Sequence, residues 1–140
     1  MFKYFRKFDY SRMILGGGEI LNISTETREI LEKYYTGLSI RGDWHSMLSE
    51  EILLTGTIAK ESKGKEPFVN NNFFKMVRSL KIKEMIVENE KACSLISYDL
   101  MSPKGKSFAS DVAEIWKVKD GKLDSLAIYF DTAAFQKSME

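Results

Sequence analysis

The feature that most constrains the fold is the stretch 108–131, in which two alternating runs of polar and apolar residues meet at Asp120-Gly121. An Asp-Gly pair between such runs strongly indicates a β-hairpin. Two registers are open: a two-residue turn, or a three-residue loop that begins at Lys119 and places the glycine in a left-handed bulge. The registers bring different side chains onto one face, so the choice decides what the hairpin buries.

We expect the three-residue loop, because register follows the face that can be buried. In this register Glu114 shares a face with the large apolar side chains of both strands, Val112, Trp116, Leu126, Ile128 and Phe130. A lone carboxylate among them is informative, because charged groups are rarely buried without a partner. Burial disfavours the charged form, so we expect the pKa of Glu114 to lie above the usual carboxyl value. A neutral acid can then donate a hydrogen bond.

The other face of the hairpin predicts how the protein assembles. It carries a set of residues too apolar to face water comfortably, Ala113, Ile115, Ser125, Ala127 and Tyr129. We therefore expect a homodimer in which the sheets of two copies pack together.

Length and composition narrow the function classes. A chain of 140 residues suits one domain with a hydrophobic core, and its net charge of +1 argues against nucleic acid as a partner. A single cysteine, Cys93, fits a reducing compartment, the cytoplasm, and we expect it to be a small buried hydrophobe. With one histidine and one cysteine, we expect no metal site and no cofactor. No apolar run approaches the length of a membrane span.

The first 22 residues form an N-terminal extension in this interpretation, followed by a single domain over 23–137. The extension is a flexible arm, a set of extra residues upstream of a start at Met13, or an amphipathic anchor that contacts a membrane surface. Three consecutive glycines, 16–18, disconnect it from the domain and favour the first two alternatives.

The remaining pattern predicts an α+β fold. A helix capped by Ser24 or Thr25 runs to Arg41-Gly42, a short helix follows Asp43, a strand covers 51–58, and a third helix starts at Pro67 and reaches Leu80. Strands over 82–88 and 92–101 then precede the hairpin. Helices gathered first and an antiparallel sheet gathered last predict helices on one face of the sheet.

This order resembles the SnoaL-like branch of the nuclear transport factor 2-like superfamily over about 25–135. The motifs that carry the resemblance are Arg41-Gly42-Asp43-Trp44, Ser102-Pro103-Lys104-Gly105, 112–116, and the hairpin from Asp120 to Asp131. The resemblance implies a cystatin-like, cone-shaped, curved antiparallel or mixed sheet wrapped around N-terminal helices, with a pocket at the wide end. The superfamily includes polyketide cyclases, ketosteroid isomerases, dehydratases, epoxide hydrolases and non-catalytic modules, so the fold does not settle the function.

The resemblance also implies roles for individual residues. The tyrosine that donates to the oxyanion in ketosteroid isomerases falls on or next to Tyr35, and the neutral acid that is their second donor falls on Glu114. Their general-base aspartate is replaced by Thr55-Gly56-Thr57, which offers no carboxylate. The base would then be His45, Asp111 or the substrate itself, although a satisfied or exposed histidine is the expectation for His45.

Three hypotheses remain open. The protein is a cofactor-independent isomerase, cyclase or lyase that uses Tyr35 and Glu114 as donors to an enolate oxygen. Alternatively, it is a non-catalytic module that binds a small carbonyl-containing or polycyclic molecule or that dimerises. In both cases an apolar pocket would be lined by Trp44, Trp116, Leu126, Ile128 and Phe130. In the third hypothesis Glu114 only satisfies Tyr34 or Tyr35 inside a filled core.

Overall fold

The computed structural model describes residues 19–57 and 61–140. Most of the predicted N-terminal extension, including the membrane contact considered for it, lies outside these residues. The first described element, α2 (Glu19–Ile40), begins before the expected cap at Ser24 or Thr25. The Ser24 hydroxyl instead accepts a hydrogen bond from the backbone N–H of Asn89, at 2.9 Å. In the part of the chain described, no helix combines the length and hydropathy needed to span a membrane.

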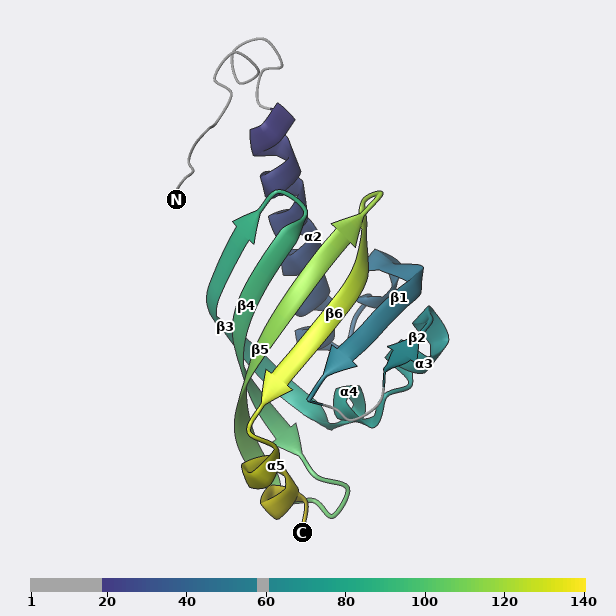
Figure 1. Ribbon diagram of the computed structural model, residues 1–140. Helices are drawn as coiled ribbons and strands as arrows, with labels where there is room; N and C mark the ends of the chain where they lie inside the picture. Colours follow the sequence, from purple (N-terminus) through teal and green to yellow (C-terminus); the bar gives the residue numbers. More distant parts are fainter. Residues whose placement is uncertain (1–18, 58–60) are drawn as a thin grey trace.

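After α2 the chain passes through a first group of short helices and strands, then through four consecutive long strands, and ends in a short helix (Figure 1). They are η1 (His45–Met47), β1 (Leu48–Gly56), β2 (Ser62–Lys63), α3 (Lys65–Val69), α4 (Asn72–Met76), β3 (Val77–Glu88), β4 (Lys91–Met101), β5 (Ser107–Lys119), β6 (Lys122–Phe130) and α5 (Thr132–Met139). The strands form one sheet in the order β2-β1-β6-β5-β4-β3. Only β1 and β6 run parallel among these neighbours, so the sheet is mixed and the predicted α+β class is confirmed.

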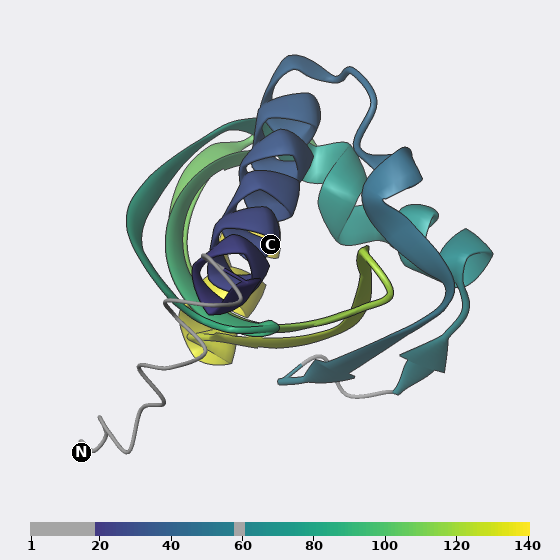
Figure 2. The ribbon, with the colours of Figure 1, turned by 90° about the horizontal axis from the view of Figure 1, so that it is seen from above.

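The sheet curves around α2, which lies against its concave face (Figure 2). Irregular pairing explains the curvature, because register shifts interrupt β3 against β4 twice and β5 against β6 once. Leu31, Tyr34, Tyr35 and Leu38 form the buried stripe of α2. The helix is also tied to the edge strand β3, because Arg28 and Arg41 donate to the backbone carbonyls of Met85 and Val77. These contacts cover part of an edge that would otherwise present unpaired carbonyls.

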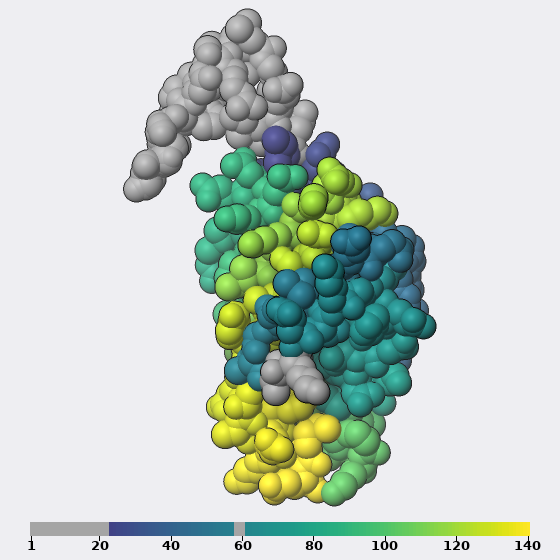
Figure 3. Space-filling model, turned by 45° about the vertical axis from the view of Figure 1, so that its right-hand side comes forward, coloured from purple at the N-terminus to yellow at the C-terminus, as the bar shows by residue number. Residues whose placement is uncertain are grey.

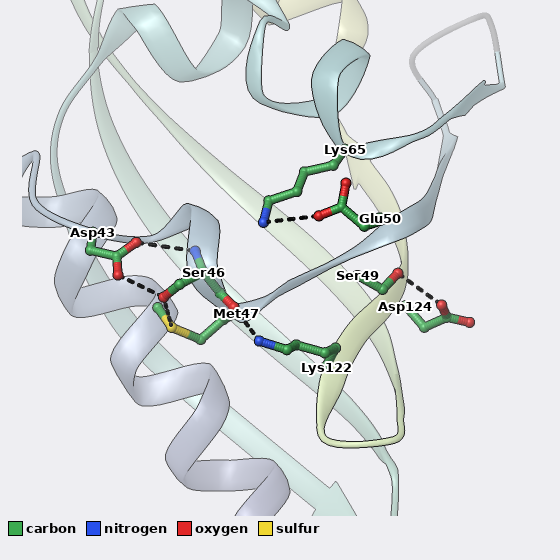
Figure 4. Close-up of polar contacts among 8 residues, drawn as sticks. All are labelled: Asp43, Ser46, Met47, Ser49, Glu50, Lys65, Lys122 and Asp124. Atoms are coloured by element: carbon green, nitrogen blue, oxygen red, sulfur yellow. Dashed lines mark hydrogen bonds and ion pairs between the residues drawn. The ribbon is translucent and has the colours of Figure 1, made fainter.

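The hairpin has a different turn from the one predicted, but it buries the predicted face. Lys119 pairs with Lys122, and both Asp120 and Gly121 have positive φ, so the turn has two residues and the predicted three-residue loop is wrong. One extra residue, Asp124, lies between the pairs Val118–Leu123 and Lys117–Ser125. Its carboxylate accepts a hydrogen bond from Ser49 on β1 at 2.9 Å (Figure 4), which holds the bulge against the neighbouring strand. Beyond this bulge Glu114 lies opposite Ile128, on the buried face that was predicted.

Two other local predictions are corrected. The third helix is interrupted: α3 ends at Val69, the Asn71 side chain caps α4 by accepting from the Phe73 N–H, and Leu80 already belongs to β3. Cys93 is exposed, because it lies on the outer face of β4 between Ile86 and Ile115.

Candidate functional site

Glu114 is the centre of a buried hydrogen-bond network that joins α2 to the sheet. The Tyr35 hydroxyl donates to Glu114 Oε1 at 2.5 Å, and the Tyr98 hydroxyl on β4 donates to Oε2 at 2.7 Å. Trp116 Nε1 donates to the Tyr35 oxygen at 2.9 Å. All four side chains are at most 1% exposed. Both carboxylate oxygens therefore have a partner in a region that water does not reach.

Burial controls the protonation of this network. Burial raises the pKa of Glu114 to about 7, and it outweighs the hydrogen bonds from Tyr35 and Tyr98, which lower this pKa. The expected upward shift is thus confirmed. Burial, reinforced by the Glu114 charge, also raises the pKa of Tyr34, Tyr35 and Tyr98 well above the usual phenol value. The three hydroxyls consequently keep their protons, while the acid changes charge near neutral pH.

Two more hydroxyls lie beside the network without a partner among the described residues. They are Tyr34 Oη and Ser94 Oγ, both fully buried. Ser94 lies directly opposite Glu114 on β4, and the Tyr34 ring packs edge to face on Trp116 with centroids 4.9 Å apart. A charged Glu114 only accepts, whereas its neutral acid carries one O–H. Protonation therefore adds one donor to the network, and the Ser94 hydroxyl opposite Glu114 is a neighbouring group that makes no hydrogen bond within the part of the chain described.

The pocket expected around Glu114 is absent from the four cavities found among the described residues. Trp116, Leu126 and Ile128 are at most 1% exposed and pack in the core, where Trp44 joins them at 8%. Of the side chains predicted to bind a ligand, Phe130 alone lines one of these four cavities. The space beside Glu114 is filled chiefly by neighbouring aromatic rings, since Tyr34, Tyr35 and Trp116 are all in edge-to-face contact.

The cavity that Phe130 lines has a volume of about 660 Å³ and lies between α4, the end of β6 and α5. Its other lining residues are Asn71, Asn72, Phe73, Met76, Lys104, Thr132, Phe135, Gln136, Met139 and Glu140. Helix α5 and the β4–β5 loop lie together at this end of the molecule (Figure 3), and Lys104 Nζ donates to the Glu140 carbonyl at 3.0 Å. This cavity was not predicted from the sequence, because helix α5, which forms one of its walls, was not predicted.

Neither predicted base lies in the network. His45 is exposed at η1, with its ring 4.2 Å from that of Trp44. Asp111 is exposed on the opposite face of the sheet, where the hydrogen bond and charge of Lys83, 3.0 Å away, lower its pKa. The contacts found among described residues join neither of them to Glu114.

The position expected for a general base is occupied by backbone. A Cβ added to Gly56 would lie 2.0 Å from the Ile128 carbonyl oxygen, so β1 approaches β6 too closely for a side chain there. The neighbouring Thr57 hydroxyl donates to the same carbonyl at 2.9 Å. The structure thus explains why no carboxylate stands at this place.

Comparisons with known proteins agree on the fold. No family model matches the chain, and no curated protein matches its sequence. Three solved structures that match are a candidate SnoaL-like polyketide cyclase from Jannaschia sp. CCS1, the protein TerC co-crystallised with polyporic acid, and an NTF2-like protein of unknown function from Cytophaga hutchinsonii ATCC 33406. Their TM-scores are 0.71, 0.69 and 0.66, at 13%, 16% and 19% identity. The matches cover 84%, 81% and 79% of this chain and 93%, 98% and 94% of theirs.

These likenesses establish the class of fold. The chain has the nuclear transport factor 2-like fold that its motif order indicated, with N-terminal helices and a six-stranded mixed sheet. At these identities the likeness shows the fold alone, so the activity has to be argued from the side chains.

Proposed function

We propose that this protein binds a small apolar molecule carrying a carbonyl oxygen, in the cavity beneath α5. The observation that carries the proposal is the lining of that cavity: a volume of about 660 Å³ with Phe73, Phe130 and Phe135 on its walls. A few hundred cubic ångströms, mostly apolar walls and a small number of polar groups are the usual properties of a small-ligand site.

The cavity lining also includes hydrogen-bond donors that suit a ligand oxygen atom. Asn72 and Gln136 carry amide N–H groups, and Lys104 carries an ammonium group that already donates to a backbone carbonyl. One of the similar folds was crystallised with polyporic acid, which supports a small organic molecule as the ligand class here.

The test is a binding measurement with N-phenyl-1-naphthylamine, a neutral dye whose fluorescence rises in apolar surroundings. Wild-type protein should enhance the fluorescence, and polyporic acid should displace the dye. Gln136→Trp places a large ring at the cavity wall and should weaken binding by roughly tenfold or more, the effect of about 1.4 kcal/mol. Ala133→Trp is the matched control, because Ala133 is exposed on the same helix and lines no described cavity. Equal binding by both variants, or none by the wild type, would contradict the proposal.

A second function, acid catalysis by Glu114, is supported by a separate observation. A carboxylic acid whose pKa is about 7, held between two tyrosine hydroxyls, is suited to donate a proton or a hydrogen bond to a carbonyl oxygen at neutral pH. The reaction would be an isomerisation, cyclisation or elimination that needs no cofactor. Glu114→Gln keeps the shape without the ionisable proton, so an enzyme should lose turnover by roughly 100-fold while ligand binding persists. Unchanged turnover in this variant would eliminate the catalytic role.

A further inference from the structure

Phe73 contacts both the cavity and the acid network. It projects from α4, lines the cavity beneath α5, and is 6% exposed. Its ring stands edge to face on the Tyr98 ring, with centroids 5.0 Å apart. Tyr98 in turn donates to Glu114 Oε2. A single aromatic side chain thus lies between the ligand cavity and one of the two donors to the buried acid.

The pairing of the strands shows how short the distance between the cavity and Glu114 is. Phe130, which lines the cavity, lies opposite Val112, and Glu114 lies opposite Ile128 on the same face. The acid is therefore two residues further along the strand, or about 7 Å at the usual rise of a strand. That distance is close to the width of one aromatic ring.

We propose that Phe73 is a specificity-determining residue that ends the cavity short of Glu114, and that its side chain decides whether a bound molecule reaches the acid. This inference rests on the proposed binding function. The ligand class it implies is an elongated apolar aldehyde or ketone that enters with its carbonyl oxygen first. With the Phe73 ring in its observed position the molecule stays in the outer cavity, so the acid catalysis proposed for Glu114 would require this ring to move aside. With a small side chain its oxygen reaches the Tyr98 and Glu114 donors.

The neighbouring Phe74 provides a matched control. It is 7% exposed, belongs to the same helix, and its removal also deletes one buried ring. Its ring packs on Phe68 and Trp44, at 5.1 and 4.9 Å between centroids, and also touches Phe73 at 5.7 Å, but it lines none of the four described cavities. Truncating Phe74 should therefore create space in the core without joining the cavity to the acid.

The first measurement follows access to the network by acrylamide quenching of Trp116. The chain has two tryptophans, so all variants carry Trp44→Phe to make Trp116 the sole reporter. Phe73→Ala should raise the quenching constant by roughly threefold or more, because close packing otherwise keeps small solutes out. Phe73→Leu should give an intermediate value, and it serves as the test variant if Phe73→Ala does not fold. N-phenyl-1-naphthylamine bound in the cavity should suppress the increase, whereas Phe74→Ala should show none.

The second measurement reads contact with the acid itself. The probe is 4-(dimethylamino)cinnamaldehyde, which absorbs at longer wavelength when its carbonyl oxygen accepts a strong hydrogen bond. In Phe73→Ala the bound probe should show this red shift at low pH and lose it as Glu114 ionises. Adding Glu114→Gln should remove the pH dependence, and the wild type should show no red shift.

The outcomes separate the two proposals. A folded Phe73→Ala or Phe73→Leu variant that quenches like the wild type, or a Phe74→Ala variant that quenches equally, would overturn the role of Phe73. A red shift that is independent of pH in Phe73→Ala would do the same. A wild type that binds no dye contradicts the binding function alone, because the quenching constants of the Phe73 and Phe74 variants are compared without a ligand.

Discussion

Glu114→Gln should make the protein less sensitive to pH, and the size of the effect can be worked out from the burial of this acid. Burial raises the pKa of Glu114 from 4.5 to about 7 in the folded protein. Between these pH values the folded state holds a proton that the unfolded state has released. The free energy of unfolding therefore falls as pH rises through this interval, by about 1.4 kcal/mol for each pH unit. Over the whole interval the loss is about 3 kcal/mol.

The contribution of Glu114 is thus most favourable below about pH 4.5 and fully lost above about pH 7. Glutamine cannot ionise, so in Glu114→Gln this dependence disappears. Relative to wild type, the variant should gain stability as pH rises. Its difference in free energy of unfolding should change by about 3 kcal/mol between the two ends of the interval.

The assay is urea unfolding followed by far-UV circular dichroism at several values between about pH 4.5 and about pH 8, for both proteins. Other groups also titrate in this range, so the quantity to compare is the difference between variant and wild type at each pH. Glu88→Gln is the control, since Glu88 is an exposed carboxylate on β3. A difference for Glu114→Gln that stays constant with pH would refute the argument that this acid is neutral in the folded protein.

Three further results are expected. Ile115 and Tyr129 are 45% and 49% exposed on the outer face of the sheet, and the expected sheet-to-sheet dimer would bury them. Ile115→Glu should therefore convert the dimer to a monomer in light scattering. A wild type that is monomeric at high concentration would contradict the dimer. In the same dimer the exposed Cys93 should react more slowly with a thiol reagent than in the Ile115→Glu monomer, and equal rates would argue for another interface. Gly56→Ala should destabilise the folded protein by several kcal/mol, because its Cβ would meet the Ile128 carbonyl. Gly105→Ala, also at positive φ but in open space, should cost about 1 kcal/mol. Equal losses of stability in calorimetry would attribute the effect to φ alone.

The hairpin shows what alternation in a sequence determines. Both a three-residue loop and a two-residue turn followed by a bulge add one residue between the strands. Either device puts Glu114, Trp116 and Leu126 on the same face, so the burial of Glu114 was predictable. The position of the extra residue was not predictable, because it depends on the contact between Asp124 and Ser49, which lies on a strand distant in sequence.

Two parts of the site depend on contacts that no local pattern reveals. Tyr98 was missed as a partner of Glu114, although its spacing from Ser94 and Ile96 placed all three on one face of β4. The filled space beside the acid was missed because the asparagines at 70–72 were interpreted as the solvated side of one helix. They instead end α3 and cap α4, and this break directs Phe73 towards Tyr98.

The energetics of Glu114 bear on which function the network serves. A buried acid that is satisfied only by tyrosines lowers stability at neutral pH by about 3 kcal/mol compared with acid pH. Packing alone does not account for such a residue, because apolar side chains of similar volume often fill such a site at no cost in stability. Strongly shifted pKa values of buried groups gather at functional sites, which supports the catalytic role proposed for Glu114. Under the functions proposed above, a carbonyl compound would approach that acid from the cavity one ring away, with Phe73 between the two.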